Sequence, residues 1–218
     1  MTQTHFVHGW SIDQVAARIA QDIPDGSFVN LGIGQPTKVG DALPADREIL
    51  LHSENGILGM GPTPTPDQFD PELINAGKMA VTLLTGGSYF HHTDSFMIMR
   101  GGHLDISVLG AYEVSVNGDL ANWSTGDPTH PPAVGGAMDL AVGAKAVFAM
   151  LTHTTKDGRS KIVRECSYPL TASHVVDRIY TNLAVIAVQS DGLHVVERAP
   201  GVSAEFLTAA TEAPLVQC

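Results

Sequence analysis

Glu54 is the one acidic side chain in the stretch HSENGILGMGP, residues 52–62, which is otherwise apolar, polar or glycine. The apolar run 49–51 precedes this stretch, and Asn55 and Gly56 directly follow the carboxylate. A carboxylate beside exposed backbone amides can attack an activated carbonyl while the amides stabilise the tetrahedral oxyanion. The pattern therefore makes Glu54 a candidate nucleophile, although an exposed residue of an Asn-Gly turn is the simpler alternative.

Two other glycine-rich turns lie at positions that often bind ligands, one at the end of a predicted strand and one at the start of a predicted helix. The turn at residues 32–36 follows a buried strand, and residues 134–137 open a predicted helix. Glycine lets backbone N–H groups approach a ligand closely, and a helix N-terminus favours negative charge. Gly32 and Gly34 are followed by Thr37 where a dinucleotide-binding turn would have a third glycine, so the sequence argues against a nicotinamide site.

The elements that must position these residues are predicted from spacing and turn signals. A helix begins after Ser11, which forms a capping box with Gln14, and the turn at Asp191-Gly192 indicates a hairpin. Strands are predicted at 27–34, 48–53, 80–86, 105–115, 146–151, 183–189 and 193–198, and further helices at 135–144 and 204–210. Strands alternate with helices, which predicts an α/β fold with a mixed, largely parallel sheet in a single domain over residues 1–218. The carboxyl ends of such strands form the crevice where ligands bind.

A group of histidines suggests a different functional class for the protein, a metal-dependent hydrolase. His91, His92 and Asp94 lie close to His103 and Asp105 in the sequence. Adjacent histidines in a strand point to opposite faces, and no pair stands four residues apart on a predicted helix. We therefore expect no metal.

Composition restricts the partners. The chain of 218 residues carries a formal charge of −11 and has no run of Lys or Arg, which argues against nucleic acid and anionic membranes as partners. Its longest aliphatic stretches, such as 183–188, are too short to span a bilayer, and its first ten residues lack a secretory pattern. The only cysteines, Cys166 and Cys218, fit a reducing cytoplasm. The low charge also suggests a surface hidden in a subunit interface.

Several segments together closely resemble the β subunit of the family I (3-oxoacid) CoA-transferases, from about residue 10 to about residue 205. They are VNLGIGQPT, SENGILGMGP, LINAGK, DSFMIMRGGHLDISVLGA, GDLANW, GGAMDLAVGAK and PLT. The resemblance implies a three-layer α/β/α fold and an obligatory α subunit of similar fold, in a heterodimer or an α2β2 heterotetramer. It also implies that Glu54 is the nucleophile, with acyl-CoA and a 3-oxo acid as substrates and no tightly bound cofactor.

The implied reaction is ping-pong: Glu54 and CoA form a thioester, which then transfers CoA to the second acid. A non-catalytic scaffold subunit is the other alternative, against which the intact Ser-Glu-Asn-Gly motif argues. The resemblance places an oxyanion-hole amide in the loop at residues 135–137, and we expect Gly32 and Gly34 to line the same crevice. The expected oxyanion and CoA-binding positions are Gly32, Gly34, Asn55, Gly56, Gly135, Gly136 and Ala137.

The segments TGGSYFHHTDSF and NWSTGDPTHPPAVGG are more similar to those of 3-oxoadipate CoA-transferases than to those of acetoacetate enzymes. The resemblance thus implies succinyl-CoA as donor and 3-oxoadipate as acceptor, with acetoacetate as the alternative. The second carboxylate of 3-oxoadipate needs a donor, for which His91, His92 and Arg100 are the candidates.

Overall fold

The computed structural model describes residues 9–127, 129 and 133–217. Cys218, the first eight residues and the middle of the segment 122–136 therefore lie outside the described residues. The helices are α1 Ile12–Asp22, α2 Lys38–Asp41, α3 His92–Arg100, α4 Ala137–Gly143 and α5 Ala204–Ala210, with a 3-10 turn η1 at Gln35–Thr37. The strands are β1 Phe28–Leu31, β2 Leu50–Ser53, β3 Ile57–Met60, β4 Leu83–Tyr89, β5 Ile106–Gly110, β6 Glu113–Ser115, β7 Leu120–Ala121, β8 Ala146–Met150, β9 Ile162–Val163, β10 Arg178–Tyr180, β11 Ala184–Gln189, β12 Gly192–Arg198 and β13 Leu215–Val216.

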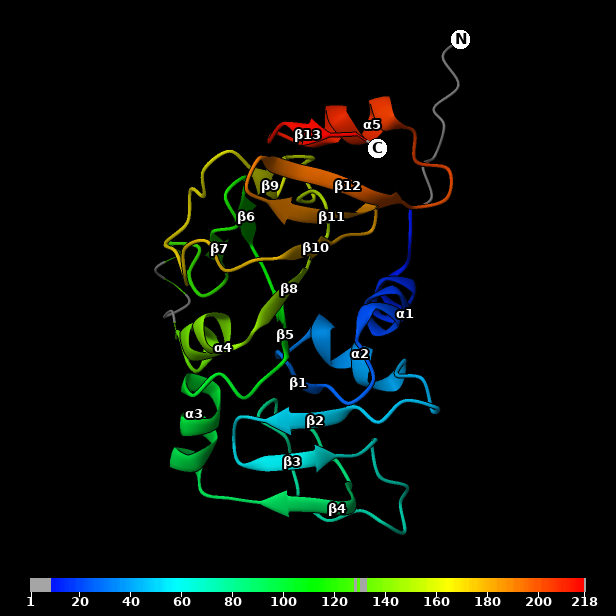
Figure 1. Ribbon diagram of the computed structural model, residues 1–218, viewed down its shortest axis with the longest axis vertical. Coiled ribbons are helices and arrows are strands. Elements are labelled where there is room, and N and C mark those ends of the chain that lie inside the picture. Colours follow the sequence, from blue (N-terminus) through cyan, green and yellow to red (C-terminus); the bar gives the residue numbers. More distant parts are fainter. Residues whose placement is uncertain (1–8, 128, 130–132, 218) are drawn as a thin grey trace.

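One large sheet runs through the length of the molecule in the order β13-β12-β11-β10-β8-β5-β1-β2-β3-β4 (Figure 1). Its central strands, from β10 to β2, are parallel to one another. Antiparallel pairs flank this centre, β2 with β3 and β4 on one side and β10 with β11 and β12 on the other. The predicted mixed, largely parallel sheet is therefore confirmed. A small sheet, β7-β6-β9, lies outside it.

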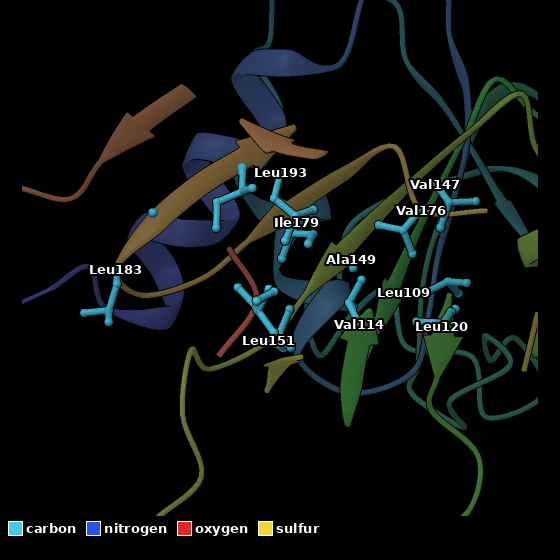
Figure 2. Packing of buried hydrophobic residues seen from close by; sticks show 14 of the residues in the cluster. Leu109, Val114, Leu120, Val147, Ala149, Leu151, Val176, Ile179, Leu183 and Leu193 are labelled. Atoms are coloured by element: carbon cyan, nitrogen blue, oxygen red, sulfur yellow. The ribbon is translucent and has the colours of Figure 1, made fainter. Parts of the chain in front are cut away.

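Helices cover both faces of the large sheet. Along β8, Val147 and Ala149 belong to one buried cluster while Phe148 and Met150 belong to another, because successive side chains of a strand point to opposite faces. The first cluster packs under α3, α4, α5 and the small sheet, and the second packs under α1 and α2. Figure 2 shows residues of the first cluster, among them Leu109, Val147 and Ala149. Each fully buried Leu or Ile contributes about 2 kcal/mol to these cores. The result is the three-layer α/β/α arrangement that the resemblance implies.

The strongest local signals of the sequence are confirmed. Ser11 Oγ accepts a hydrogen bond from the Gln14 amide at 3.2 Å, and Gln14 Oε1 accepts one from the Ser11 amide at 2.8 Å, which is the predicted capping box of α1. Asp191 and Gly192 lie at the turn that joins β11 to β12. No helix in the described ranges is both long and apolar enough to cross a membrane.

Two sequence predictions are wrong. The single strand expected at 105–115 breaks after Gly110 into β5 and β6, and β6 joins the small sheet instead of the large one. The Gly110 carbonyl accepts a hydrogen bond from Asn122 Nδ2 at 3.0 Å, and the Tyr112 amide then pairs with the Ala121 carbonyl, so the chain turns toward β7. The sequence predicts no helix over residues 92–100, yet His91 and His92 stand at the start of α3, where His91 Nδ1 accepts from the Thr93 amide as the N-cap.

Two histidines are buried and neutral. His153 Nε2 lies 2.9 Å from the Thr211 hydroxyl, which itself donates to the Leu207 carbonyl, so the ring donates through Nε2. His52 Nδ1 lies 3.0 Å from Asn30 Nδ2, a donor, so this ring also keeps its proton on Nε2. Burial lowers the pKa of each ring from 6.5 to about 4.

Acid should therefore destabilise the fold before its carboxylates are protonated. Between pH 6.5 and about 4, these two histidines are protonated in the unfolded chain but not in the folded protein. The free energy of unfolding therefore falls as the pH drops through this range. The loss is up to about 3 kcal/mol per ring, at a slope of about 1.4 kcal/mol per pH unit. Urea unfolding at several pH values should show a shallower slope for His153→Gln, whereas His174→Gln, at an exposed ring, should keep the original slope. Identical slopes for all three proteins would contradict neutral burial of His153.

Candidate active site

Glu54 follows β2 directly, so its side chain lies at the carboxyl edge of the parallel strands. A cavity of about 560 Å³, here called the Glu54 cavity, opens over the carboxyl ends of β2, β1, β5 and β8. Residues at all four strand ends line it: Leu31 and Gly32, Ser53 and Glu54, Gly110 and Ala111, Met150 and Leu151. The carboxylate predicted from the sequence thus stands at the wall of a cavity large enough for a small organic substrate.

The loop before α4 packs directly onto the Glu54 carboxylate. A Cβ atom placed on Gly136 would collide with Oε2 of Glu54, so only glycine allows this approach. Gly136 is the N-cap of α4, and Gly135, Gly136 and Ala137 all line the cavity. The first amides of a helix have no partner within the helix itself. The Ala137 amide already donates to the Val134 carbonyl at 3.2 Å. Those of Gly135 and Gly136 have no acceptor among the residues that the structure describes.

Electrostatics favour a basic Glu54. The side chain is half-buried, and this burial raises the pKa of its carboxyl group; the negative charge of Asp139 raises the pKa further, while His92 lowers it. No residue in the described part of the chain forms a hydrogen bond with the carboxylate. A carboxylate without donors to hold its charge is a stronger nucleophile than a solvated one, because its basicity is higher.

A buried polar network fixes the end of β2. Asn30 Nδ2 donates to both the ring and the carbonyl of His52, and His52 Nε2 lies 3.0 Å from Ser95 Oγ in α3. His52 as a whole is 1 % exposed. These bonds join β1, β2 and α3 two residues before Glu54, so they hold the backbone from which the carboxylate projects.

Asn55 and Gly56 form the turn beyond Glu54 and do not line the Glu54 cavity. Asn55 Nδ2 donates to the Ile74 carbonyl at 2.7 Å. Gly56 has a φ of 114°, and a Cβ there would collide with the Phe90 carbonyl, so both residues set the backbone of the turn. Gly32 lines the cavity, but its amide donates to the Val108 carbonyl at 2.8 Å.

Gly34 and the candidates for substrate choice stand outside the Glu54 cavity. Gly34 is the N-cap of η1, with a φ of 91°. Arg100 Nε lies 2.5 Å from Asp139 Oδ1, so its charge is already paired. The ring of His92 lies 4.7 Å from that of Phe96. In the described residues, no group of three or more His, Cys, Asp or Glu side chains is placed to hold a metal ion.

The sequence analysis missed one charged residue of the cavity, Lys161, together with the polar groups of Asn30, Asn122 and Thr152. Lys161 lies after a polar turn, far along the chain from Glu54, and reaches the cavity only because β9 packs beside β6. An isolated lysine in a polar segment carries no sequence signal for such a position.

Comparisons with known proteins identify a matching family, similar sequences and a similar fold. The sequence pattern of the family described as Coenzyme A transferase matches residues 12–210. The chain is 59% identical over 209 residues to the B-type subunit of the 3-oxoadipate CoA-transferase of Acinetobacter baylyi, covering 96% of each protein. It is 44% identical over 200 residues to the B-type subunit of the probable succinyl-CoA:3-ketoacid coenzyme A transferase of Bacillus subtilis, covering 92% of each. The fold matches that of an acyl-CoA transferase apoenzyme from Escherichia coli O157:H7 with a TM-score of 0.74 at 22% identity, covering all of this chain and 43% of the other.

Proposed function

The chain belongs to the coenzyme A transferase family, and from this premise we propose that it is the catalytic subunit of an enzyme that moves CoA from succinyl-CoA to 3-oxoadipate. The observation that carries the proposal is Glu54 at the wall of the cavity, with Gly136 packed against its carboxylate. The family match at residues 12–210 supports a single domain over residues 1–218.

The reaction starts with the attack of a Glu54 carboxylate oxygen on the thioester carbonyl of succinyl-CoA. The carbon–sulfur bond breaks, which gives a succinyl-glutamyl anhydride and CoA thiolate. The thiolate then attacks the glutamyl carbonyl, and succinate leaves as a carboxylate. The resulting glutamyl-CoA thioester reacts with 3-oxoadipate by the same steps in reverse. One thioester is exchanged for another, so the balanced reaction requires no oxidant, reductant or nucleotide.

Oxyanion stabilisation in this scheme falls to the loop before α4. Negative charge develops on the carbonyl oxygen in each addition step, and preorganised amides lower its energy. The amides of Gly135 and Gly136 suit this role better than that of Ala137, because Ala137 already donates to Val134. Gly32 lines the cavity beside the substrate but does not donate a hydrogen bond to it, since its amide already donates to the Val108 carbonyl.

A partner subunit completes the proposed site. The chain carries 12 Lys and Arg residues against 23 Asp and Glu, and of the described cavity wall only Lys161 is cationic. CoA phosphates need cations, so a homologous α subunit is proposed to supply them, in a heterodimer or an α2β2 heterotetramer. Both relatives are named as one subunit of their enzymes, which supports this assembly. The two cysteines are consistent with a cytoplasmic enzyme.

The purified chain alone should therefore be nearly inactive, and adding the α subunit should restore transfer. The measurement is 3-oxoadipyl-CoA formation from succinyl-CoA by the chain, by the α subunit and by the mixture, with assembly followed by light scattering. Full turnover by the homogeneous chain alone would contradict the need for a partner.

The substrate is tested in the same complex by offering 3-oxoadipate and acetoacetate side by side. The greater identity to the 3-oxoadipate relative, 59% against 44%, supports 3-oxoadipate as the preferred acceptor. The 44% relative makes a 3-ketoacid such as acetoacetate the second candidate. If the complex preferred acetoacetate, the proposed acceptor would be wrong, whereas the proposed CoA-transfer reaction would still hold.

A further inference from the structure

The Glu54 cavity has charge at two places in its described wall, Glu54 and Lys161. Glu54 already has a role in the proposed reaction, as the nucleophile. Lys161 has no role in that chemistry, yet a lysine turned toward a substrate cavity costs desolvation energy that an anionic ligand would offset.

Among the residues that the structure describes, the Lys161 ammonium has no carboxylate as counter-ion. Its one polar side-chain contact among the described residues is Thr152 Oγ1 at 3.4 Å, which is long for a hydrogen bond, and no charged group in the described part of the chain shifts its pKa. The side chain is half-buried, and this burial lowers the pKa of the ammonium group. An unpaired cation in such a place is suited to bind an anion from solution.

The backbone around Lys161 is fixed. Its amide donates to the His153 carbonyl at 3.0 Å, and its carbonyl accepts from the Val114 amide at 2.9 Å. The ring of His153 is in turn buried and bonded on both sides, by Thr181 and Thr211. The base of the lysine is therefore preorganised, which reduces the entropy lost when its head binds a ligand.

The positions of the two charges suit a short dicarboxylate. Thr152, which the ammonium contacts, lies two residues beyond β8, and Glu54 lies one residue beyond β2. β8 and β2 are separated by β5 and β1, so three strand spacings place these chain positions roughly 14 Å apart. The side chains of Lys161 and Glu54 occupy part of that distance. With C–C bonds of about 1.5 Å, an extended four-carbon diacid such as succinate spans roughly 4 Å and a six-carbon diacid roughly 6 Å. The flexible four-carbon stem of lysine lets its ammonium group meet the distal carboxylate of either one.

We propose that Lys161 binds the distal carboxylate of the acyl group and so places its reacting carbonyl carbon beside Glu54. This inference rests on the proposed function and names the residue of that site that selects dicarboxylic substrates. His91 and His92 are positioned at the start of α3 outside the cavity wall, and Arg100 is paired with Asp139, so none of these three presents an unpaired cation to the cavity.

The test compares Lys161→Met with the original protein in the assembled complex. The readout is the half-reaction in which the enzyme takes CoA from an acyl-CoA, followed with succinyl-CoA, which has a distal carboxylate, and with acetoacetyl-CoA, which lacks one. We expect kcat/KM to fall about ten- to hundredfold for succinyl-CoA, mainly through KM, and to change little for acetoacetyl-CoA. Lys161→Arg should restore part of the loss. Lys145→Met is the matched control, since Lys145 pairs with Asp105 at 2.8 Å outside the cavity, and it should alter neither substrate.

Equal losses on both acyl-CoA substrates would overturn the proposal, because they would place Lys161 on the CoA moiety or in a purely structural role. Unchanged kinetics with both would overturn it as well. A binding measurement separates this result from a failure of the proposed function. Adipate should raise the melting temperature of the original complex and not that of Lys161→Met, whereas hexanoate should raise neither. A complex without transferase activity that still shows this adipate response would refute the proposed function alone; equal adipate responses of both proteins would refute the role of Lys161.

Discussion

Replacing Glu54 by Ala should abolish CoA transfer by the assembled enzyme while leaving the fold and the assembly intact. The substitution removes the oxygen that forms the covalent bond, so kcat should fall by several orders of magnitude. The side chain is half-buried and makes no hydrogen bond within the described ranges, so its loss should change the melting temperature little. Steady-state transfer from succinyl-CoA to 3-oxoadipate and thermal unfolding of the same preparations measure the two effects.

Two further variants separate position from chemistry at Glu54. Glu54→Asp keeps a carboxylate but withdraws it by about one C–C bond of 1.5 Å, which should cost about a hundredfold or more in rate. Glu54→Gln keeps the shape and removes the anion, and should be as inactive as Glu54→Ala. Turnover near the original rate in Glu54→Ala would show that Glu54 is not the nucleophile.

Gly136→Ala should lower kcat about a hundredfold without unfolding the protein. The added Cβ would collide with Oε2 of Glu54, and the flexible carboxylate is the group that must move away. The backbone of Gly136 has φ −83° and ψ 3°, which an alanine adopts without strain, so the loop itself should survive. A displacement of about 1 Å at a nucleophile is enough for a loss of this size. Single-turnover formation of the enzyme–CoA thioester reports the chemical step directly.

Gly110→Ala provides the matched control. Gly110 also lines the cavity, but a Cβ there meets no atom within 4 Å, so the methyl group should leave Glu54 in place and most of the activity intact. If Gly136→Ala were as active as Gly110→Ala, the close contact between the loop and the carboxylate would have no part in catalysis. If Gly136→Ala failed to fold, the collision would have been relieved by the backbone instead of by Glu54.

The fold could be predicted where local signals act alone. The capping box of Ser11 and Gln14 and the turn at Asp191-Gly192 depend on neighbouring residues, and both elements formed as expected. Glu54 at a strand end followed from the apolar run before it. The break after Gly110 could not be predicted, because it depends on Asn122 and on the partner strands of β6, which the sequence pattern of one segment does not reveal.

The helix α3 was missed for a related reason. Ser95 and Met99 are its buried residues, too few to give an apolar stripe, and its start depends on the His91 ring as N-cap. Lys161 was missed because nothing near it in the sequence points to the cavity. Its place follows from the pairing of β9 with β6 and from the carbonyl of His153. The residues next to Lys161 in the sequence do not indicate its position, because that position depends on long-range packing. Glu54 could be predicted because it lies in the recognisable motif Ser-Glu-Asn-Gly.

The most direct test of Glu54 as nucleophile is to locate the CoA adduct. The assembled enzyme is incubated with succinyl-CoA and no acceptor, and treated with borohydride, which reduces a glutamyl thioester to the alcohol. The peptide mass spectrum then shows which residue has changed. Burial raises the pKa of the Glu54 carboxyl, and the nearby His92 lowers it. The proposed attack needs the ionised carboxylate, so formation of the adduct at neutral pH tests that form directly. The account predicts loss of activity and a mass change at Glu54 within SENGILGMGP, absent in Glu54→Ala. A CoA adduct on any other residue, or full transfer with no covalent adduct at all, would contradict it.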